Sequence, residues 1–384
     1  MDLESLKLVE SIHRTKGMAS LVIAGAGSQA INAILSVAGA SRTVLDIQVP
    51  YASSAVIDYL GAEPAQYVST DAALSLARAA YFRAVKLREV ASPVFGVACT
   101  ATIATDRPKR GDHRCHVCVY GSTGWKSASI TFVKGLRSRD QEDAVVSRLI
   151  LNSIAESLDV SERLDLKLSS DESVLTDALC LDDPLDALSQ GHIGHVLIDT
   201  EGRKEADAAF KGGIIPGSFN PRHIGHDRLA QVASDLLELP VAYELSVTNV
   251  DKPELETSEV RRRIDQFNGS ASIIATRAPV FYEKARLLPG CTFVIGFDTL
   301  VRLVDTKYYG NSPAKMMSAF FEMRSLGCSF LVAGRLEGDG FKTLTAAEVP
   351  SYLNDMFAAI PESMFREDIS STQIRVAAER SGSA

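Results

Sequence analysis

The stretch that decides the fold of the chain's second half is GIIPGSFNPRHIGH, which runs from Gly213 to His226. Residues 213–215 form a short apolar segment that ends at Pro216-Gly217, which predicts a buried strand followed by a tight turn. From Ile224 to Leu237 the apolar residues recur on one face at helical spacing, which predicts a helix. The stretch therefore predicts a strand, a glycine turn and a helix in succession.

Strands and helices are expected to alternate through the rest of this region. The expected strands are 241–247, 272–275, 292–297 and 330–333, and the expected helices are 257–267, 280–288, 313–326 and a last one from about 370. Such alternation predicts an α/β fold with a Rossmann-like, doubly wound parallel sheet covered on both faces. Ligands of such folds lie beyond the carboxyl ends of the strands, where the strand order reverses.

The turn and the helix that follows it have the features of an anion site. A turn that begins with Gly217 lets the backbone approach a phosphate closely. His223 and His226 lie three residues apart at the start of the helix, so both imidazoles can face one side. Gly225 lies between them and leaves room for a nucleotide, and the positive end of the helix favours an anion.

Two further motifs follow along the chain. ISSTQIR, from Ile369 to Arg375, places adjacent hydroxyl groups at a helix start, where they can cap the helix or donate to phosphate oxygens. Arg375 lies about one turn further and offers a forked donor. VIGFDTL, from Val294 to Leu300, places Asp298 just beyond a strand, where it can meet a ribose or a base or cap the next helix.

GSFNPRHIGH, GFDTL and ISSTQIR together resemble the motifs of the nicotinamide/nicotinate mononucleotide adenylyltransferases, in the HxGH nucleotidyltransferase superfamily. The three occur in family order over residues 217–375. The resemblance implies direct transfer of the adenylyl group of ATP, accompanied by Mg²⁺, to a small phosphorylated acceptor, with release of pyrophosphate. Pantetheine-phosphate adenylyltransferases share a related pair of motifs and remain an alternative, as does a catalytically silent nucleotide-binding regulatory or scaffold protein.

The resemblance also implies residue roles. The expected catalytic residues, which meet the triphosphate, are His223, His226 and Arg375. The expected ATP-binding residues are Gly217, Ser218, Phe219, Gly225, Lys252, Asp298, Ser371 and Thr372. For Lys252 a solvated loop position is an equal alternative, and the run 261–263 of three arginines is interpreted as a solvated helix face.

Two segments imitate functional motifs. HIGH at 192–195 repeats the HxGH letters, but no Gly-Ser-Phe turn precedes it and a strand, not a helix, is expected after it, so we interpret it as coincidence. HRCHVC at 113–118 has metal-ligand residue types, but they alternate as in a strand, and side chains on opposite faces cannot share one ion.

Residues 1–160 resemble the CinA C-terminal domain, a nicotinamide-nucleotide amidase. Aligning on VAGAS places Ala24 at the family's nucleophilic serine, while Ser28 falls on a glycine position. The family's tyrosine matches Tyr51, but its nearby lysine falls on Val56. A serine amidase needs a nucleophile together with an activating base. We therefore expect a non-catalytic domain that serves binding, regulation or assembly into a homo-oligomer; an amidase acting together with the second half is the alternative.

Composition and charge bear on the domain organisation, the possible functions and the compartment of the protein. Residues 161–207 are acidic and are expected to form a linker between the domains 1–160 and 208–384. The net charge of −8 argues against nucleic-acid binding. No apolar run reaches the roughly 20 residues that span a bilayer, and charges interrupt the N-terminal segment where a signal peptide would be apolar. The six cysteines are mostly scattered, as expected for a reduced, cytoplasmic protein.

Overall fold

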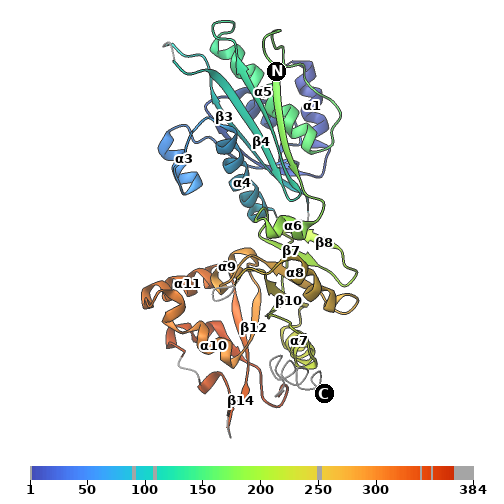
Figure 1. Cartoon of the computed structure of the whole chain (residues 1–384), viewed down its shortest axis with the longest axis vertical. Helices are drawn as coiled ribbons and strands as arrows, with labels where there is room; N and C mark the ends of the chain where they lie inside the picture. The colour runs from blue at the N-terminus through green and yellow to red at the C-terminus, as the bar shows by residue number, and fades with distance from the viewer. Residues whose placement is uncertain are drawn as a thin grey trace. The chain divides into compact units, whose positions relative to one another are not determined.

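The computed structural model describes residues 2–88, 92–106, 110–248, 253–337, 340–346 and 349–366. The chain forms two compact units, Met1–Asp182 and Asp183–Ala384, called here the first and the second unit. Each is an α/β unit built on its own sheet (Figure 1), which confirms the expected fold class. Within the described residues, no helix is both long enough and apolar enough to span a membrane.

The sheet of the first unit has the strand order β2-β1-β3-β4-β5-β6. Strand β1 runs parallel to both of its neighbours, β2 and β3, and the remaining pairs of neighbouring strands are antiparallel. The strands are β1 (Met18–Ala24), β2 (Val44–Gln48), β3 (Val94–Thr102), β4 (His113–Gly121), β5 (Gly124–Phe132) and β6 (Val174–Cys180). The helices are α1 (Leu3–His13), α2 (Ser28–Ser36), α3 (Ser53–Leu60), α4 (Thr70–Leu87) and α5 (Arg139–Ser157).

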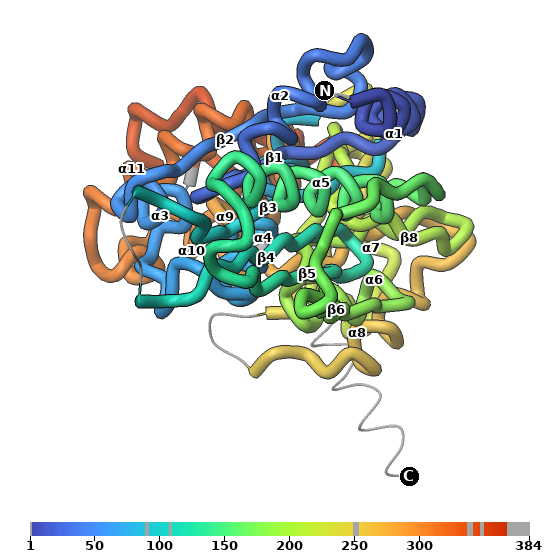
Figure 2. Tube along the Cα trace, turned by 90° about the horizontal axis from the view of Figure 1, so that it is seen from above, coloured from blue at the N-terminus to red at the C-terminus, as the bar shows by residue number. Residues whose placement is uncertain are grey.

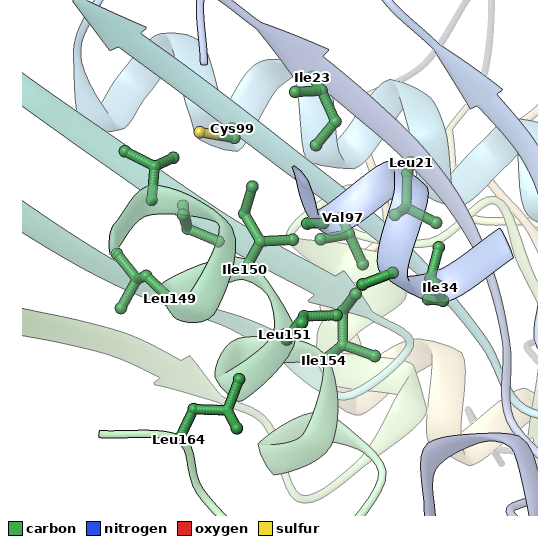
Figure 3. Close-up of a cluster of buried hydrophobic side chains, with 14 of the residues drawn as sticks. Leu21, Ile23, Ile34, Val97, Cys99, Leu149, Ile150, Leu151, Ile154 and Leu164 are labelled. Carbon is green, nitrogen blue, oxygen red and sulfur yellow. The ribbon is translucent and has the colours of Figure 1, made fainter. Parts of the chain in front are cut away.

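Helices cover both faces of this sheet. On one face, α1, α2 and α5 bury their apolar sides against β1, β3, β4 and β5, and α1 lies beside α5 (Figures 1 and 2). Figure 3 shows Ile150 and Ile154 of α5 among Leu21, Ile34 and Val97. Helix α4 packs on β1, β3 and β4 with its own row of buried small and apolar residues. The apolar faces are thus removed from water, which is the main source of stability.

The sheet of the second unit has the order β16-β13-β12-β9-β10-β11-β7-β8. The six strands from β16 to β11 are parallel, and β7 and β8 are added antiparallel at one edge. The strands are β7 (His195–Ile198), β8 (Lys204–Ala206), β9 (Gly213–Pro216), β10 (Val241–Ser246), β11 (Ile273–Thr276), β12 (Thr292–Gly296), β13 (Ser329–Ala333) and β16 (Phe357–Ala359). The chain proceeds from β9 to β10 and β11 on one side and returns to β12 on the other, so the strand order reverses at β9.

The helices of this unit are α6 (Pro184–Ser189), α7 (Ile224–Leu237), α8 (Thr257–Ile264), α9 (Phe281–Leu287), α10 (Phe297–Leu303) and α11 (Pro313–Ser325). A small antiparallel pair, β14 (Arg335–Glu337) with β15 (Gly340–Lys342), follows β13. Helices α9, α10 and α11 contribute to an apolar cluster with the central strands, in which Phe293, Phe320 and Phe330 are fully buried. This cluster fixes the strands whose ends form the site described below.

The acidic segment 161–207 differs from the expected linker. Residues up to 182 belong to the first unit, where β6 pairs with β5, and residues from 183 belong to the second unit. There α6 precedes β7, and β7 pairs with both β11 and β8. The acidic side chains lie at exposed positions of these elements or in ion pairs, such as Asp183 with Lys204, so an acidic composition did not exclude regular structure.

Candidate functional site

The loop between β9 and α7 is shaped by one buried phenylalanine. Phe219 is 1% exposed and has a left-handed backbone, with φ of 42°. Its ring folds back over Gly217, where a Cβ atom would lie 2.6 Å from the ring. A side chain at 217 would therefore displace the ring, which explains the glycine at this position. The Gly217 N–H donates to the backbone carbonyl of Glu244, so the loop is also tied to β10 at 2.9 Å.

Phe219 anchors an aromatic cluster beneath the loop. Its ring makes edge contacts with His226, Tyr243 and Phe267, at centroid distances of 5.1, 5.4 and 5.1 Å. Edge-to-face packing of this kind stabilises aromatic pairs beyond the burial of their area. The phenyl ring thus fixes the second histidine of the motif against the core.

The two motif histidines lie face to face. Their ring centroids are 3.7 Å apart with an interplanar angle of 25°. The His223 backbone N–H donates to Nδ1 of His226 at 3.1 Å. Burial, assisted by the neighbouring His223, lowers the pKa of His226 to about 4. His226 is therefore neutral at pH 7, and because its Nδ1 accepts a hydrogen bond, Nε2 carries its proton.

Arg222 and Gln266 hold the other side of the loop. The Arg222 guanidinium donates to Asp227 at 2.7 Å and to Ser270 at 2.7 Å, and it lies over the Phe267 ring at 4.7 Å. Gln266 accepts from the Arg222 backbone N–H and donates to the Phe219 carbonyl, both at 2.9 Å. These bonds fix both ends of the segment that leads into the histidines.

A cleft of about 350 Å³ opens where β9 and β10 end, near the reversal of strand order. Gly217 and Ser218 form part of its wall. Other lining residues are Glu244, Leu245 and Ser246 at the end of β10, Arg263 of α8, Val280, Phe281 and Lys284 around α9, and Thr299, Arg302, Leu303, Tyr308 and Tyr309 in and after α10. This is the place where doubly wound sheets bind their ligands.

Charged groups in the cleft come in pairs. Arg263 is held by Glu259 at 2.7 Å and donates to the Ser218 carbonyl at 3.0 Å. Lys284 and Glu244 form a buried ion pair, with 2.6 Å between Nζ and Oε1. Nε of Arg302, an exposed residue, donates to the Tyr308 hydroxyl at 2.9 Å. Arginines beside backbone N–H groups of a glycine loop can bind a phosphorylated ligand.

The predicted site residues divide into three groups. Gly217 and Ser218 line the cleft, and Phe219, His223, Gly225 and His226 belong to the same loop and first helical turn. Asp298 lies in the first turn of α10, where Gly296 is the N-cap, and it forms an exposed ion pair with Arg335. Lys252, Ser371, Thr372 and Arg375 lie outside the described residues, so their predicted roles stay predictions.

Sequence reasoning missed several cleft residues. The arginine run 261–263 is more than a solvated face, because Arg263 lines the cleft and Arg262 donates to Asn220 of the loop at 2.9 Å. Glu244 and Lys284 were also missed. The signal for Glu244 was a carboxylate inside the otherwise apolar strand VAYELS, since a buried charge in a strand requires a partner.

Both imitating segments are structural. His195 begins β7 and is 2% exposed, and its Nε2 bonds the Ala208 carbonyl at 2.8 Å. HRCHVC lies within β4, with Cys115 and Cys118 buried. Over the described part of the chain, no group of three His, Cys, Asp or Glu side chains is placed to hold a metal ion.

The first unit has a cleft of its own, of about 360 Å³, after β1. It is lined by Ile23, Gly25, Ala26, Ser28, Ile31, Val49, Tyr51, Arg139, Asp140 and Asp143. The Asp143 carboxylate accepts from the Gly27 and Ser28 N–H groups, at 2.7 and 3.2 Å, and from the Ser28 hydroxyl at 3.0 Å. These residues include the hydroxyls of Ser28 and Tyr51 but neither lysine nor histidine.

Fold and site together define an α/β protein whose second unit holds a ligand cleft near the switch point of a doubly wound sheet. No family model matches the chain. It is 26% identical over 179 residues to a Schizosaccharomyces pombe protein named "Putative nicotinamide mononucleotide adenylyltransferase", covering 42% of this chain and 68% of that protein.

Solved structures of CinA-type proteins also match. Competence/damage inducible protein CihA from Agrobacterium tumefaciens matches with 21% identity and a TM-score of 0.33, over 41% of this chain and 99% of that one. A CinA superfamily protein from Escherichia coli matches with 15% identity and a TM-score of 0.32, over 40% and 88%. The expected resemblance to both groups is confirmed.

Proposed function

We propose that the second unit transfers the adenylyl group of ATP to nicotinamide or nicotinate mononucleotide and releases pyrophosphate. The observation that carries the proposal is the stacked pair His223–His226 at the start of α7, with a neutral His226, in the loop whose first residues line the cleft. The similarity to the S. pombe protein supports the same class of reaction.

The proposed reaction is a direct displacement. An oxygen of the acceptor phosphate forms a bond to the α-phosphorus of ATP, while the bond from that phosphorus to the bridging oxygen breaks and pyrophosphate leaves. A phosphate needs no general base, so the protein contributes positioning and stabilisation of charge. Mg²⁺ bound with ATP would supply further positive charge at the phosphates.

Each loop feature has a role in this scheme. The backbone of Gly217 and Ser218 lines the nucleotide, and Nε2–H of His226 donates to a phosphate oxygen. A neutral imidazole suits this role, because it keeps its donor across the physiological pH range. Arg263 adds positive charge at Ser218. The roles of Ser371, Thr372 and Arg375 with the β- and γ-phosphates, and of Lys252 and Asp298, belong to the same proposal.

The test is pyrophosphate release with ATP and Mg²⁺ across an acceptor screen. We expect release only with a mononucleotide acceptor, and a loss of roughly 10²–10³-fold in kcat for His226→Ala, as for removal of a preorganised donor. Asp355→Asn, which removes a surface carboxylate paired with Arg324, is the matched control and should keep full activity. A wild-type protein that uses 4′-phosphopantetheine instead, or no acceptor at all, would refute the assignment.

We propose further that the first unit is non-catalytic, because Ala24 stands where the CinA-type amidases have their nucleophilic serine and the described part of the cleft lining contains no lysine. Deamidation of nicotinamide mononucleotide by the purified chain, abolished by Ser28→Ala, would contradict this.

A further inference from the structure

The buried ion pair Glu244–Lys284 lies in the wall of the cleft and not deep in the core. Glu244 is 1% exposed and Lys284 is 5% exposed, yet both line the cleft. Oε1 of Glu244 accepts from Lys284 Nζ at 2.6 Å and from the Thr276 hydroxyl at 2.5 Å. Buried ion pairs contribute little net stability compared with apolar residues of similar volume. A pair held at a cleft wall therefore suggests recognition of a ligand.

The pair presents one acceptor and one donor side by side. Both hydrogen bonds described for the Glu244 carboxylate are accepted by Oε1, and a carboxylate has about four acceptor sites in all. The ammonium of Lys284 has three protons, of which one is committed to Glu244. Nearby, Phe281, Tyr308 and Tyr309 line the same cleft, so aromatic side chains form part of its wall.

A primary carboxamide on an aromatic ring matches this arrangement. Its NH₂ can donate to Glu244 and its carbonyl can accept from Lys284, and a neutral group suits a pair whose net charge is zero. A carboxylate has acceptors only, so it would place a second negative charge beside Glu244 in a buried setting, where like charges are costly.

We infer, resting on the proposed function, that Glu244 and Lys284 select the amide acceptor, nicotinamide mononucleotide, over its acid counterpart. The geometry thereby resolves the choice that the sequence motifs leave open.

The experiment measures kcat/KM of the full chain for nicotinamide and nicotinate mononucleotides with saturating ATP. The wild type should prefer the amide by about tenfold or more, as expected when a wrong ligand leaves buried polar groups unmatched. Glu244→Gln removes the repelling charge, so the preference should fall to roughly threefold or less, mainly through faster use of the acid. Asp355→Asn should leave the ratio unchanged.

Thermal unfolding of each variant checks that it is folded. If Glu244→Gln is unstable because Lys284 is left unpaired, the double variant Glu244→Gln, Lys284→Gln carries the test, since it keeps a neutral hydrogen-bonding pair. A wild type that prefers the acid, or variants that lower both activities in proportion, would show a purely structural pair and overturn the inference. Absence of pyrophosphate release with either mononucleotide would instead refute the proposed function, and this inference with it.

Discussion

At the scale of single residues, the protonation of His226 links the site to stability. Burial lowers the pKa of this imidazole from 6.5 to about 4. Between those values the unfolded chain binds a proton that the folded chain does not, so folding stability is present above pH 6.5 and is lost as the pH falls toward 4. We expect a loss of roughly 2 kcal/mol from this group, less than the full shift implies because the imidazole is only partly buried.

Urea unfolding of the wild type and of His226→Gln between pH 7 and pH 4 measures this loss. Burial also lowers the pKa values of His13 and His116, so only the difference between the two proteins counts. Parallel stability curves for the two would show that His226 titrates normally in the folded state.

At the scale of elements, the first unit depends on a close approach of α4 to β3. A Cβ atom at Gly96 would lie 1.9 Å from the Ala77 carbonyl oxygen and 2.2 Å from the Tyr81 nitrogen. Both are backbone atoms of α4, so Gly96→Ala must push the helix away from the strand. We expect a destabilisation of about 3 kcal/mol, measured by urea unfolding. Gly111→Ala, where nothing lies within 4 Å, is the control; equal stability of the two variants would contradict the prediction.

The sequence predicted the strongly patterned elements well. Helix α7 has the expected bounds, because one apolar face and a clear start define it, and α11 ends within a residue of the expectation. Strand β6 was missed because most of its residues are exposed, so no alternation of apolar and polar residues marks it. Strand β7 matches the strand expected after HIGH at 192–195, whereas β8 is too short to stand out in an acidic segment.

The site was predicted where a local motif carries it. The β9–α7 loop is contiguous in sequence, and its glycines and histidines have recognisable roles. Glu244 and Lys284 could not be paired in advance, because they lie 40 residues apart and meet only through the packing of α9 against β10. Arg263 was discounted because a run of arginines does not show which one points toward the cleft.

At the scale of the whole molecule, the boundary between the units decides which fragments fold. Strand β7 pairs with β11 along Ile273–Thr276, whose residues are all buried. We expect residues 183–384 to fold as a monodisperse unit, and residues 208–384 to aggregate because an apolar edge strand is left bare. Size-exclusion chromatography and circular dichroism compare the two fragments. If residues 208–384 are as stable as residues 183–384, the second unit does not need residues 183–207, and these residues are a linker as the composition predicts.

The carboxylate of Asp143 places a negative charge at the N-terminal end of α2 in the first unit. It accepts hydrogen bonds from the backbone N–H groups there and from the Ser28 hydroxyl. An anion that approaches these backbone amides would find them already donating to Asp143, and the Asp143 carboxylate would repel it. We therefore expect this cleft to bind an anionic ligand only where Asp143 moves away from the start of α2.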